Sequence, residues 1–236
     1  MAFAALCLAA EIVAAPAGAQ RYHDFTTPRP LPPNSYLIIG FMGSLERWNS
    51  EIRSVRKLAL DLRAKEFSNV YVETVENKHG RLALRLIRDA LDRNRDGKLD
   101  EQERASARII LYGHSLGAAA VVSLARELKS LGVPVLLTIQ VDSVGFTDRT
   151  IPENVARAAN FYQHTSPLLH GRAKIRAEDP QKTSILGNFK YDYTHKRVDL
   201  SQVSFLEQAF GGAHTRMEFD PDVWAAVERL ILHEIQ

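Results

Sequence analysis

The segment whose residues most clearly suggest catalytic chemistry has a serine at its centre: Gly113-His114-Ser115-Leu116-Gly117. An apolar run at 108–112 precedes it and an Ala-rich run at 116–131 follows it, which predicts a strand, a tight turn and a helix. Such a turn projects the serine hydroxyl above a sheet, and the two glycines leave room where strand and helix approach each other. Because the N–H groups that begin the helix point at the same place, Ser115 is a candidate nucleophile for acyl transfer.

This motif in this context resembles the nucleophile elbow of the α/β-hydrolase superfamily, in particular lipase- and esterase-like members that carry Gly-His-Ser-Leu-Gly. The resemblance covers the chain from about Ser35 to the C-terminus in the order of its elements. It implies an α/β-hydrolase fold, in which a mainly parallel sheet has helices on both faces. It also implies catalytic residues in the chain order serine, acid, histidine. His114, whose side chain points away from that of its neighbour, is interpreted as a packed structural residue.

The resemblance places the general base in a loop just before the last helix, and His214 fits that position. It lies in a stretch at 211–214 that is expected to be a flexible loop, and Asp220 with Pro221 begins the C-terminal helix. The chain has eight histidines. The alternative base is His195, because it precedes a segment that could turn back toward the site.

Asp142 is the candidate acid because it directly follows the apolar run at 133–141. A carboxylate at the carboxyl end of a strand can orient an imidazole and stabilise its cation. Some lipase-like members take their acid from this strand. Asp179 is the alternative acid, and a turn-capping role would also suit Asp142, since Ser143 and Gly145 lie beside it.

An oxyanion hole needs two backbone donors. The sequence predicts one of them to be the N–H of Leu116, directly after the nucleophile. The other is expected from the loop after the first strand, 40–43, whose glycines allow a close backbone approach. Within that loop the donor is Phe41 or Met42.

A separate pattern, DRNRDGKLDEQE at 92–103, matches a calcium-binding EF-hand loop. Such a loop needs oxygen ligands at positions 1, 3, 5, 7, 9 and 12 and a glycine at position 6. The ligand positions are filled in order by Asp92, Asn94, Asp96, the carbonyl of Lys98, Asp100 and Glu103. Only a short helix at 101–107 fits before the next strand, and no second loop is present to pair with. The sequence therefore predicts an isolated structural Ca²⁺ loop, and no organic cofactor.

The other predicted elements position these residues. Strands are expected at 35–40, 70–75 and 156–163, helices at 48–65, 81–91 and 223–235, and a hairpin excursion at 174–194. Strands that alternate with helices predict a mainly parallel sheet, and in such sheets sites lie at the carboxyl ends of the strands. Residues 20–34 are rich in proline and predict an extended lead-in to a hydrolase domain at 35–236 that contains the loop at 92–103.

Length and composition fit one soluble domain. The chain has 236 residues, 45% of them hydrophobic, and a formal net charge of +2 with acids and bases interspersed. That charge pattern argues against a nucleic-acid partner. The single cysteine, Cys7, lies in the N-terminal apolar run, so the folded body has neither a disulfide nor a thiol nucleophile.

These features predict a serine hydrolase that cleaves a carboxylic ester, lipase- or esterase-like, with a small-molecule or lipid ester as its substrate. Thioesters or amides would use the same parts. The alternative is a non-catalytic, calcium-stabilised binding module on a hydrolase fold. The distance between Nε2 of His214 and Oγ of Ser115 distinguishes the two hypotheses.

Residues 1–19 are apolar and Ala-rich and end in Ala17-Gly18-Ala19, which predicts a secretory signal peptide, although no basic residue precedes Arg21. The run is too short and, at Glu11, too interrupted for a stable membrane insertion. The predicted location is therefore secreted or periplasmic.

If this segment is a signal, the mature protein in its native host begins at or near Gln20. N-terminal sequencing of the native protein checks this expectation. A mature chain that retains residues 2–19 would contradict it.

Overall fold

The computed structural model describes residues 18–166 and 169–236, and the structural statements below concern that part of the chain. Most of the predicted signal segment, 1–17, lies outside the described residues. Gln20 is buried, and its side-chain amide donates a hydrogen bond of 2.8 Å to the carbonyl of Thr74. The carbonyl of Gly18 also accepts a hydrogen bond of 2.7 Å from the guanidinium of Arg47, so the described chain contacts the packed body from its first residues.

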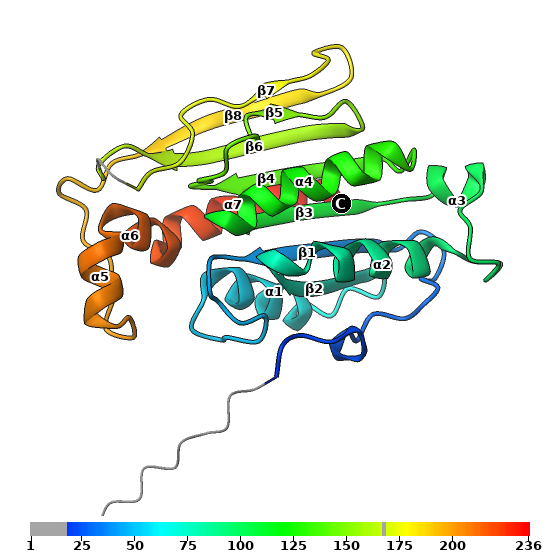
Figure 1. The fold of residues 1–236 in the computed structure, drawn as a ribbon, viewed down its shortest axis with the longest axis horizontal. Helices are drawn as coiled ribbons and strands as arrows, with labels where there is room; N and C mark the ends of the chain where they lie inside the picture. Colours follow the sequence, from blue (N-terminus) through cyan, green and yellow to red (C-terminus); the bar gives the residue numbers. More distant parts are fainter. Residues whose placement is uncertain (1–17, 167–168) are drawn as a thin grey trace, which may run out of the picture.

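A six-stranded sheet lies at the centre of the molecule, with the strand order β2-β1-β3-β4-β6-β8 (Figure 1). All of its neighbouring strands run parallel. The strands are β1 (Tyr36–Met42), β2 (Val70–Glu76), β3 (Ile109–His114), β4 (Val135–Val141), β6 (Val155–Gln163) and β8 (Ser184–Tyr191). Because they share one direction, their carboxyl ends lie along a single edge of the sheet, which we call the carboxyl edge.

Helices cover both faces of this sheet (Figure 1). One face packs against α2 (Gly80–Leu91) and α4 (Leu116–Ser130), and the other against α1 (Ser54–Ala64) and α7 (Pro221–Ile235). A strand that is buried on both faces needs apolar residues at successive positions, and β1 and β3 have such continuous apolar runs. The predicted α/β class, a mainly parallel sheet with helices on both faces, is confirmed.

Short elements lie at the two ends of the sheet (Figure 1). The helix α3 (Glu101–Ala105) lies at the end where β3 begins, whereas α5 (Phe205–Gly211) and α6 (Ala213–Phe219) lie at the carboxyl edge. Two further short strands, β5 (Thr150–Ile151) and β7 (Arg176–Ala177), pair in parallel with each other.

The predicted hairpin at 174–194 is wrong. Strand β8 pairs in parallel with β6 along seven residue pairs and so extends the main sheet. Its approach passes through β7, which pairs with β5 from an earlier part of the chain. Among its described residues, 164–166 and 169–183, the return from β6 to β8 contains no helix. The helical spacing that usually marks a parallel crossover was therefore not there to be recognised in the sequence.

Two smaller predictions also need correction. The helix expected at 48–65 begins only at Ser54, because Arg53 has an extended backbone. The lead-in at 20–34 contains a 3-10 helix, Tyr22–Asp24, and buries Phe25 in the core. Across the described ranges, no helix is both long enough and apolar enough to cross a membrane.

Candidate active site

Ser115 occupies the sharp junction between β3 and α4. Its backbone has φ 57° and ψ −124°, a region that L-residues rarely adopt, and its N–H donates to the carbonyl of Val141 over 2.9 Å. Such strain persists only where the surrounding structure fixes it. The junction therefore holds the hydroxyl of Ser115 at the carboxyl edge in one orientation.

Two glycines make this junction possible. A Cβ on Gly113 would meet the backbone of Gly117 at 2.7 Å, and a Cβ on Gly117 would meet the carbonyl oxygen of Phe41 at 2.2 Å. Both contacts are far closer than a methyl group allows. The spacing of the motif thus follows from the close packing of α4 against β3 and against the end of β1.

His214 lies between Ser115 and Asp142. Its Nε2 is 2.9 Å from Oγ of Ser115, and its Nδ1 is 2.6 Å from Oδ2 of Asp142. All three residues are buried, with exposed fractions of 7%, 6% and 0% for His214, Ser115 and Asp142. The structure therefore brings together the three residues that the sequence singled out, and in that arrangement a proton can pass from the hydroxyl to an oriented imidazole.

His214 is the second residue of α6 and does not lie in a loop, so the expectation of a flexible stretch at 211–214 is wrong. The helices α5 and α6 meet at Gly212, whose φ of 52° ends one helix and begins the other. The two glycines suggested a loop because a junction between two short helices requires the same backbone freedom that a loop requires.

Asp142 sits in a shell of donors that sequence reasoning missed. Gln163, at the end of β6, donates its side-chain amide to Oδ2 over 2.9 Å and its backbone N–H to Oδ1 over 3.3 Å. The N–H of Gly171 also donates to Oδ1, and a Cβ at that position would meet the carboxylate at 2.6 Å. These bonds fix the carboxylate and compensate its burial. No sequence motif marks Gln163, which is found only from the pairing of β6 beside β4.

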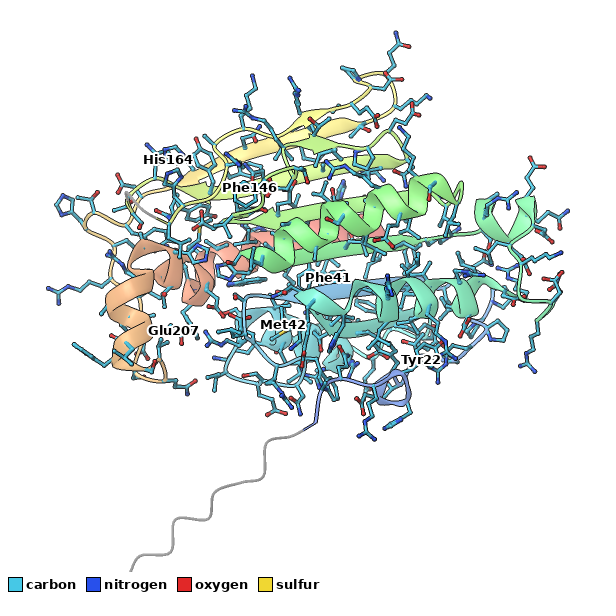
Figure 2. All side chains as sticks on the ribbon, viewed as in Figure 1. Tyr22, Phe41, Met42, Phe146, His164 and Glu207 are labelled. Atoms are coloured by element: carbon cyan, nitrogen blue, oxygen red, sulfur yellow. The ribbon has the colours of Figure 1, made fainter. Side chains whose placement is uncertain are left out.

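The predicted oxyanion donors lie around the same edge. Leu116 is the first residue of α4, so its N–H has no acceptor within the helix. Phe41 and Met42 end β1 and are fully buried (Figure 2). The next amide, that of Gly43, already donates to Oε2 of Glu46 over 2.6 Å. The amide of Gly43 is therefore already used, and Phe41 and Met42 remain the two candidate donors of this loop.

His114 packs directly behind the candidate base. It is 2% exposed, and its ring lies 4.6 Å from that of His214 at an interplanar angle of 32°. Burial, together with the neighbouring imidazole, lowers the pKa of His114 well below its ordinary value. His114 is thus a neutral, packed side chain that supports the ring of His214.

The alternative residues lie elsewhere. His195 is exposed on the segment between β8 and α5, and Asp179 accepts a hydrogen bond of 2.9 Å from the backbone of Gln181 in the turn before β8. That turn precedes the strand, so Asp179 lies at the edge opposite Ser115. The structure does not bring either residue to the site.

Large apolar side chains are exposed on the segments of the carboxyl edge, and we call these residues the apolar rim. They follow β1, β3 and β4 or lie on α5: Leu45, Leu116, Phe146, Phe205 and Leu206. Leu45 and Phe146 are 97% and 95% exposed (Figure 2 labels Phe146). Exposed apolar side chains on these segments are available to contact an apolar ligand. A cavity of about 570 Å³ between α1 and α7 contains no triad residue and belongs to another region.

The EF-hand-like loop at 92–103 connects α2 to α3. Its side chains accept the loop's own amides: Asp92 from Asp96 and Gly97, and Glu103 from Arg93 over 2.7 Å. Gly97 has a φ of 78°, as its turn position requires. The loop is therefore folded back on itself, with hard oxygen donors of the kind that calcium prefers.

The parallel strand order and the strand–turn–helix at Ser115 define an α/β-hydrolase fold. No protein family and no curated protein matches the sequence. Among solved structures, a cutinase-like protein from Cryptococcus sp. is similar at 13% identity and a TM-score of 0.47, over 89% of this chain and 98% of that one. A Trichoderma reesei cutinase with a phosphonate inhibitor is 14% identical at a TM-score of 0.35, over 83% and 78% of the two chains.

An uncharacterised protein from Pseudomonas aeruginosa is 11% identical at a TM-score of 0.41, over 66% of this chain. This chain covers 40% of the length of that protein.

The elbow generates a stability prediction. Gly117→Ala should lower the melting temperature, with a loss of about 1–3 kcal/mol in the free energy of unfolding, because the new methyl group displaces the backbone at Phe41. Gly80→Ala is the matched control, since it begins α2 with nothing within 4 Å of its Cβ. Thermal melts of both variants check the prediction. Equal melting temperatures would show that the elbow is not packed as described.

Proposed function

We propose that this protein is a serine hydrolase that cleaves carboxylic esters, with Ser115 as nucleophile, His214 as general base and Asp142 as the acid that orients it. The observation that carries the proposal is the pair of contacts at His214, 2.9 Å to Oγ of Ser115 and 2.6 Å to Oδ2 of Asp142. Those distances lie in the range in which general-base catalysis operates.

In the proposed first step, Oγ of Ser115 attacks the ester carbonyl while Nε2 of His214 takes its proton. The imidazolium that forms is stabilised by the carboxylate of Asp142, which the shell of Gln163 and Gly171 keeps in place. His214 then protonates the leaving alcohol. The carbon–oxygen bond of the ester breaks, and an acyl group remains on Ser115.

The tetrahedral oxyanion of that step would bind the N–H of Leu116 and the N–H of Phe41 or Met42. The packing of Gly117 on the carbonyl of Phe41 supports this role, because it fixes the two sources of donors relative to each other. Water then attacks the acyl group with His214 again as base, which releases the acid and restores Ser115.

The alternative of a non-catalytic binding module is less well supported. A module that only binds has no need for a strained serine, a base within hydrogen-bond distance and a carboxylate buried behind it. Maintaining all three costs stability, since positive φ at a non-glycine residue and a buried charge are both unfavourable.

The apolar rim supports an ester with an apolar acyl or alcohol group as the substrate, either a small molecule or a lipid. Leu45 follows the oxyanion loop, Leu116 follows the nucleophile and Phe146 follows the acid strand, so exposed apolar side chains adjoin each proposed catalytic segment. The loss of water from such surfaces favours binding by roughly 25 cal/mol per Å².

Substitutions at the triad test the catalytic proposal. Ser115→Ala and His214→Ala should each lower the turnover of short p-nitrophenyl esters by roughly 10⁴-fold or more, because triad members act as a unit. His195→Ala is the matched control and should leave turnover unchanged, since His195 is exposed away from the site. Initial rates on the purified variants, with thermal melts to confirm folding, check this. Wild-type turnover in Ser115→Ala would refute the assignment.

Calcium is proposed as a structural ion, held by the side chains of Asp92, Asn94, Asp96, Asp100 and Glu103 and the carbonyl of Lys98. The loop ends where β3 begins, whereas Ser115 follows the end of that strand (Figure 1). The two are therefore roughly 15 Å or more apart along the strand, too far for the ion to act on the scissile carbonyl. The four carboxylates among these ligands repel each other, and a divalent cation would relieve that repulsion.

Millimolar calcium should accordingly raise the melting temperature relative to EGTA and leave the turnover of esters unchanged. Stabilisation by mass action reaches about 2.7 kcal/mol at a hundredfold excess over the dissociation constant. The variant Asp92→Ala plus Glu103→Gln should show no calcium shift. A wild type that does not shift, or turnover that requires calcium, would contradict the structural role.

A further inference from the structure

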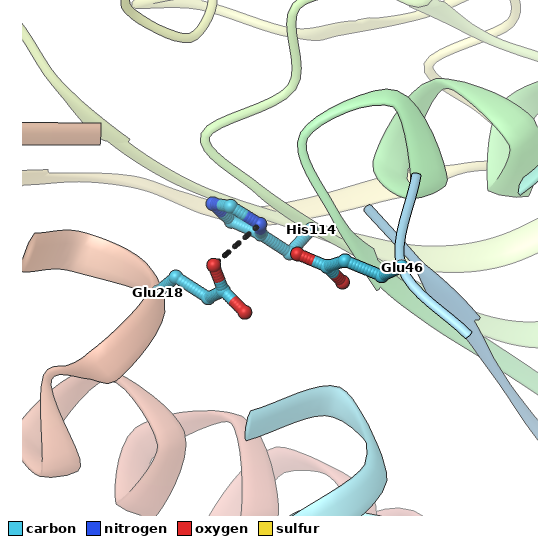
Figure 3. Close-up of side chains that lie close together, drawn as sticks. All are labelled: Glu46, His114 and Glu218. Atoms are coloured by element: carbon cyan, nitrogen blue, oxygen red, sulfur yellow. Dashed lines mark ion pairs between the residues drawn. The ribbon is translucent and has the colours of Figure 1, made fainter. Parts of the chain in front are cut away.

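Three buried side chains of the types that bind metals meet beside the candidate base, and none of them belongs to the triad (Figure 3). Glu46 follows the oxyanion loop, His114 precedes Ser115, and Glu218 lies about one turn beyond His214 on α6. A ligand atom of each lies within 4.8 Å of those of the other two. Their side chains are 6%, 2% and 3% exposed, so the group is not a solvated surface cluster.

The ring of His114 lacks the hydrogen-bond partners that a buried histidine normally has. Among residues 18–166 and 169–236, neither of its ring nitrogens has a hydrogen-bond partner, and its Nδ1 faces Oε2 of Glu218 at 3.9 Å. Oε1 of Glu218 has no partner either. Buried polar atoms are almost always paired, so a histidine and a carboxylate left open toward each other call for an explanation.

The charges around the cluster are unbalanced. Arg53 is the cation that contacts it, at 3.6 Å from Glu46 and 3.1 Å from Glu218, and it also pairs with Glu207. Three carboxylates against one guanidinium leave two negative charges when all are ionised. A divalent cation would supply the missing charge.

We propose that Glu46, His114 and Glu218 form a binding site for a divalent transition metal of the zinc class. Imidazole nitrogen with carboxylate oxygen suits Zn²⁺, whereas Ca²⁺ and Mg²⁺ prefer oxygen ligands alone. Tetrahedral zinc places its ligand atoms roughly 3.4 Å apart, whereas the ligand atoms of the three side chains lie within 4.8 Å of one another, so the side chains would move toward a bound ion. Three protein ligands leave one position open to water.

The hydrogen bonds around the cluster leave the required atoms free. Oε2 of Glu46 accepts the amide of Gly43, and its Oε1 lies beyond hydrogen-bond distance of Arg53. Oε2 of Glu218 holds Arg53 at 3.1 Å while Oε1 is open. One oxygen of each carboxylate can therefore turn to a metal without breaking the bonds that hold the loop.

A metal at this position would lie close to the catalytic machinery. The ring of His114 packs on that of His214, so the bound cation would disfavour the imidazolium that His214 must form, and zinc would slow ester turnover. This consequence rests on the proposed function. The binding site itself does not.

The test is a zinc titration of the full chain in competition with a chromophoric zinc chelator, in the Asp92→Ala plus Glu103→Gln background to silence the EF-hand-like loop. We expect one Zn²⁺ per chain. His114→Ala and Glu218→Gln should each weaken binding by at least ~10-fold, because even substitutions outside a metal's own ligands cost about 10–100-fold. Millimolar Ca²⁺ or Mg²⁺ should not compete.

Two matched controls accompany these variants. Glu73→Gln removes a buried carboxylate that pairs with Arg63 but has no histidine beside it, and His195→Ala removes an exposed histidine. Both should bind zinc as the parent does. Thermal melts verify folding, and Glu46→Gln replaces any ligand variant that does not fold. Absence of stoichiometric zinc, or equal binding by the ligand variants and the controls, would overturn the proposal. Because binding is read from the chelator and not from turnover, failure of the hydrolase proposal would leave this result intact.

Discussion

The strained backbone of Ser115 at the junction of β3 and α4 is the constraint on which the rest of the site depends. The N–H of Ser115 is held by the carbonyl of Val141, and the next residue along that strand is Asp142. On its other side, Gly117 lies so close to the carbonyl of Phe41 that no side chain fits between them. One tight junction therefore sets the position of the candidate nucleophile relative to both the acid and the oxyanion loop, all on strands whose register is fixed by the core.

The histidine reaches this junction by a different physical route. It arrives on α6, a short helix held at the carboxyl edge by polar contacts, including that of Glu218 with Arg53. Its imidazole is then fixed by Asp142 in front and by the neutral ring of His114 behind. A site built in this way concentrates buried polar groups in one place, and each must be paired or neutral for the fold to tolerate it. The unpaired atoms of His114 and Glu218 are thus the exception that motivates a metal site.

Sequence reasoning anticipated what depends on local pattern. The apolar runs of β1 and β3, the glycines around Ser115 and the Asp220-Pro221 start of α7 each carry their signal within a few residues. The features it missed depend on contacts between distant segments. Gln163 matters only because β6 lies beside β4, and β8 is a sheet strand only because an irregular connection returns it in parallel. The glycines before His214 were ambiguous because a loop and a helix junction require the same backbone freedom.

The central claim is that Ser115 is made nucleophilic by His214. It is tested most directly by reaction with a fluorophosphonate, followed by mass spectrometry of the peptides. The account predicts one phosphonyl group per chain, attached to Ser115, in the wild-type protein and almost no labelling in His214→Ala over the same time. Labelling of another residue, or equal labelling of Ser115 in the absence of His214, would contradict it.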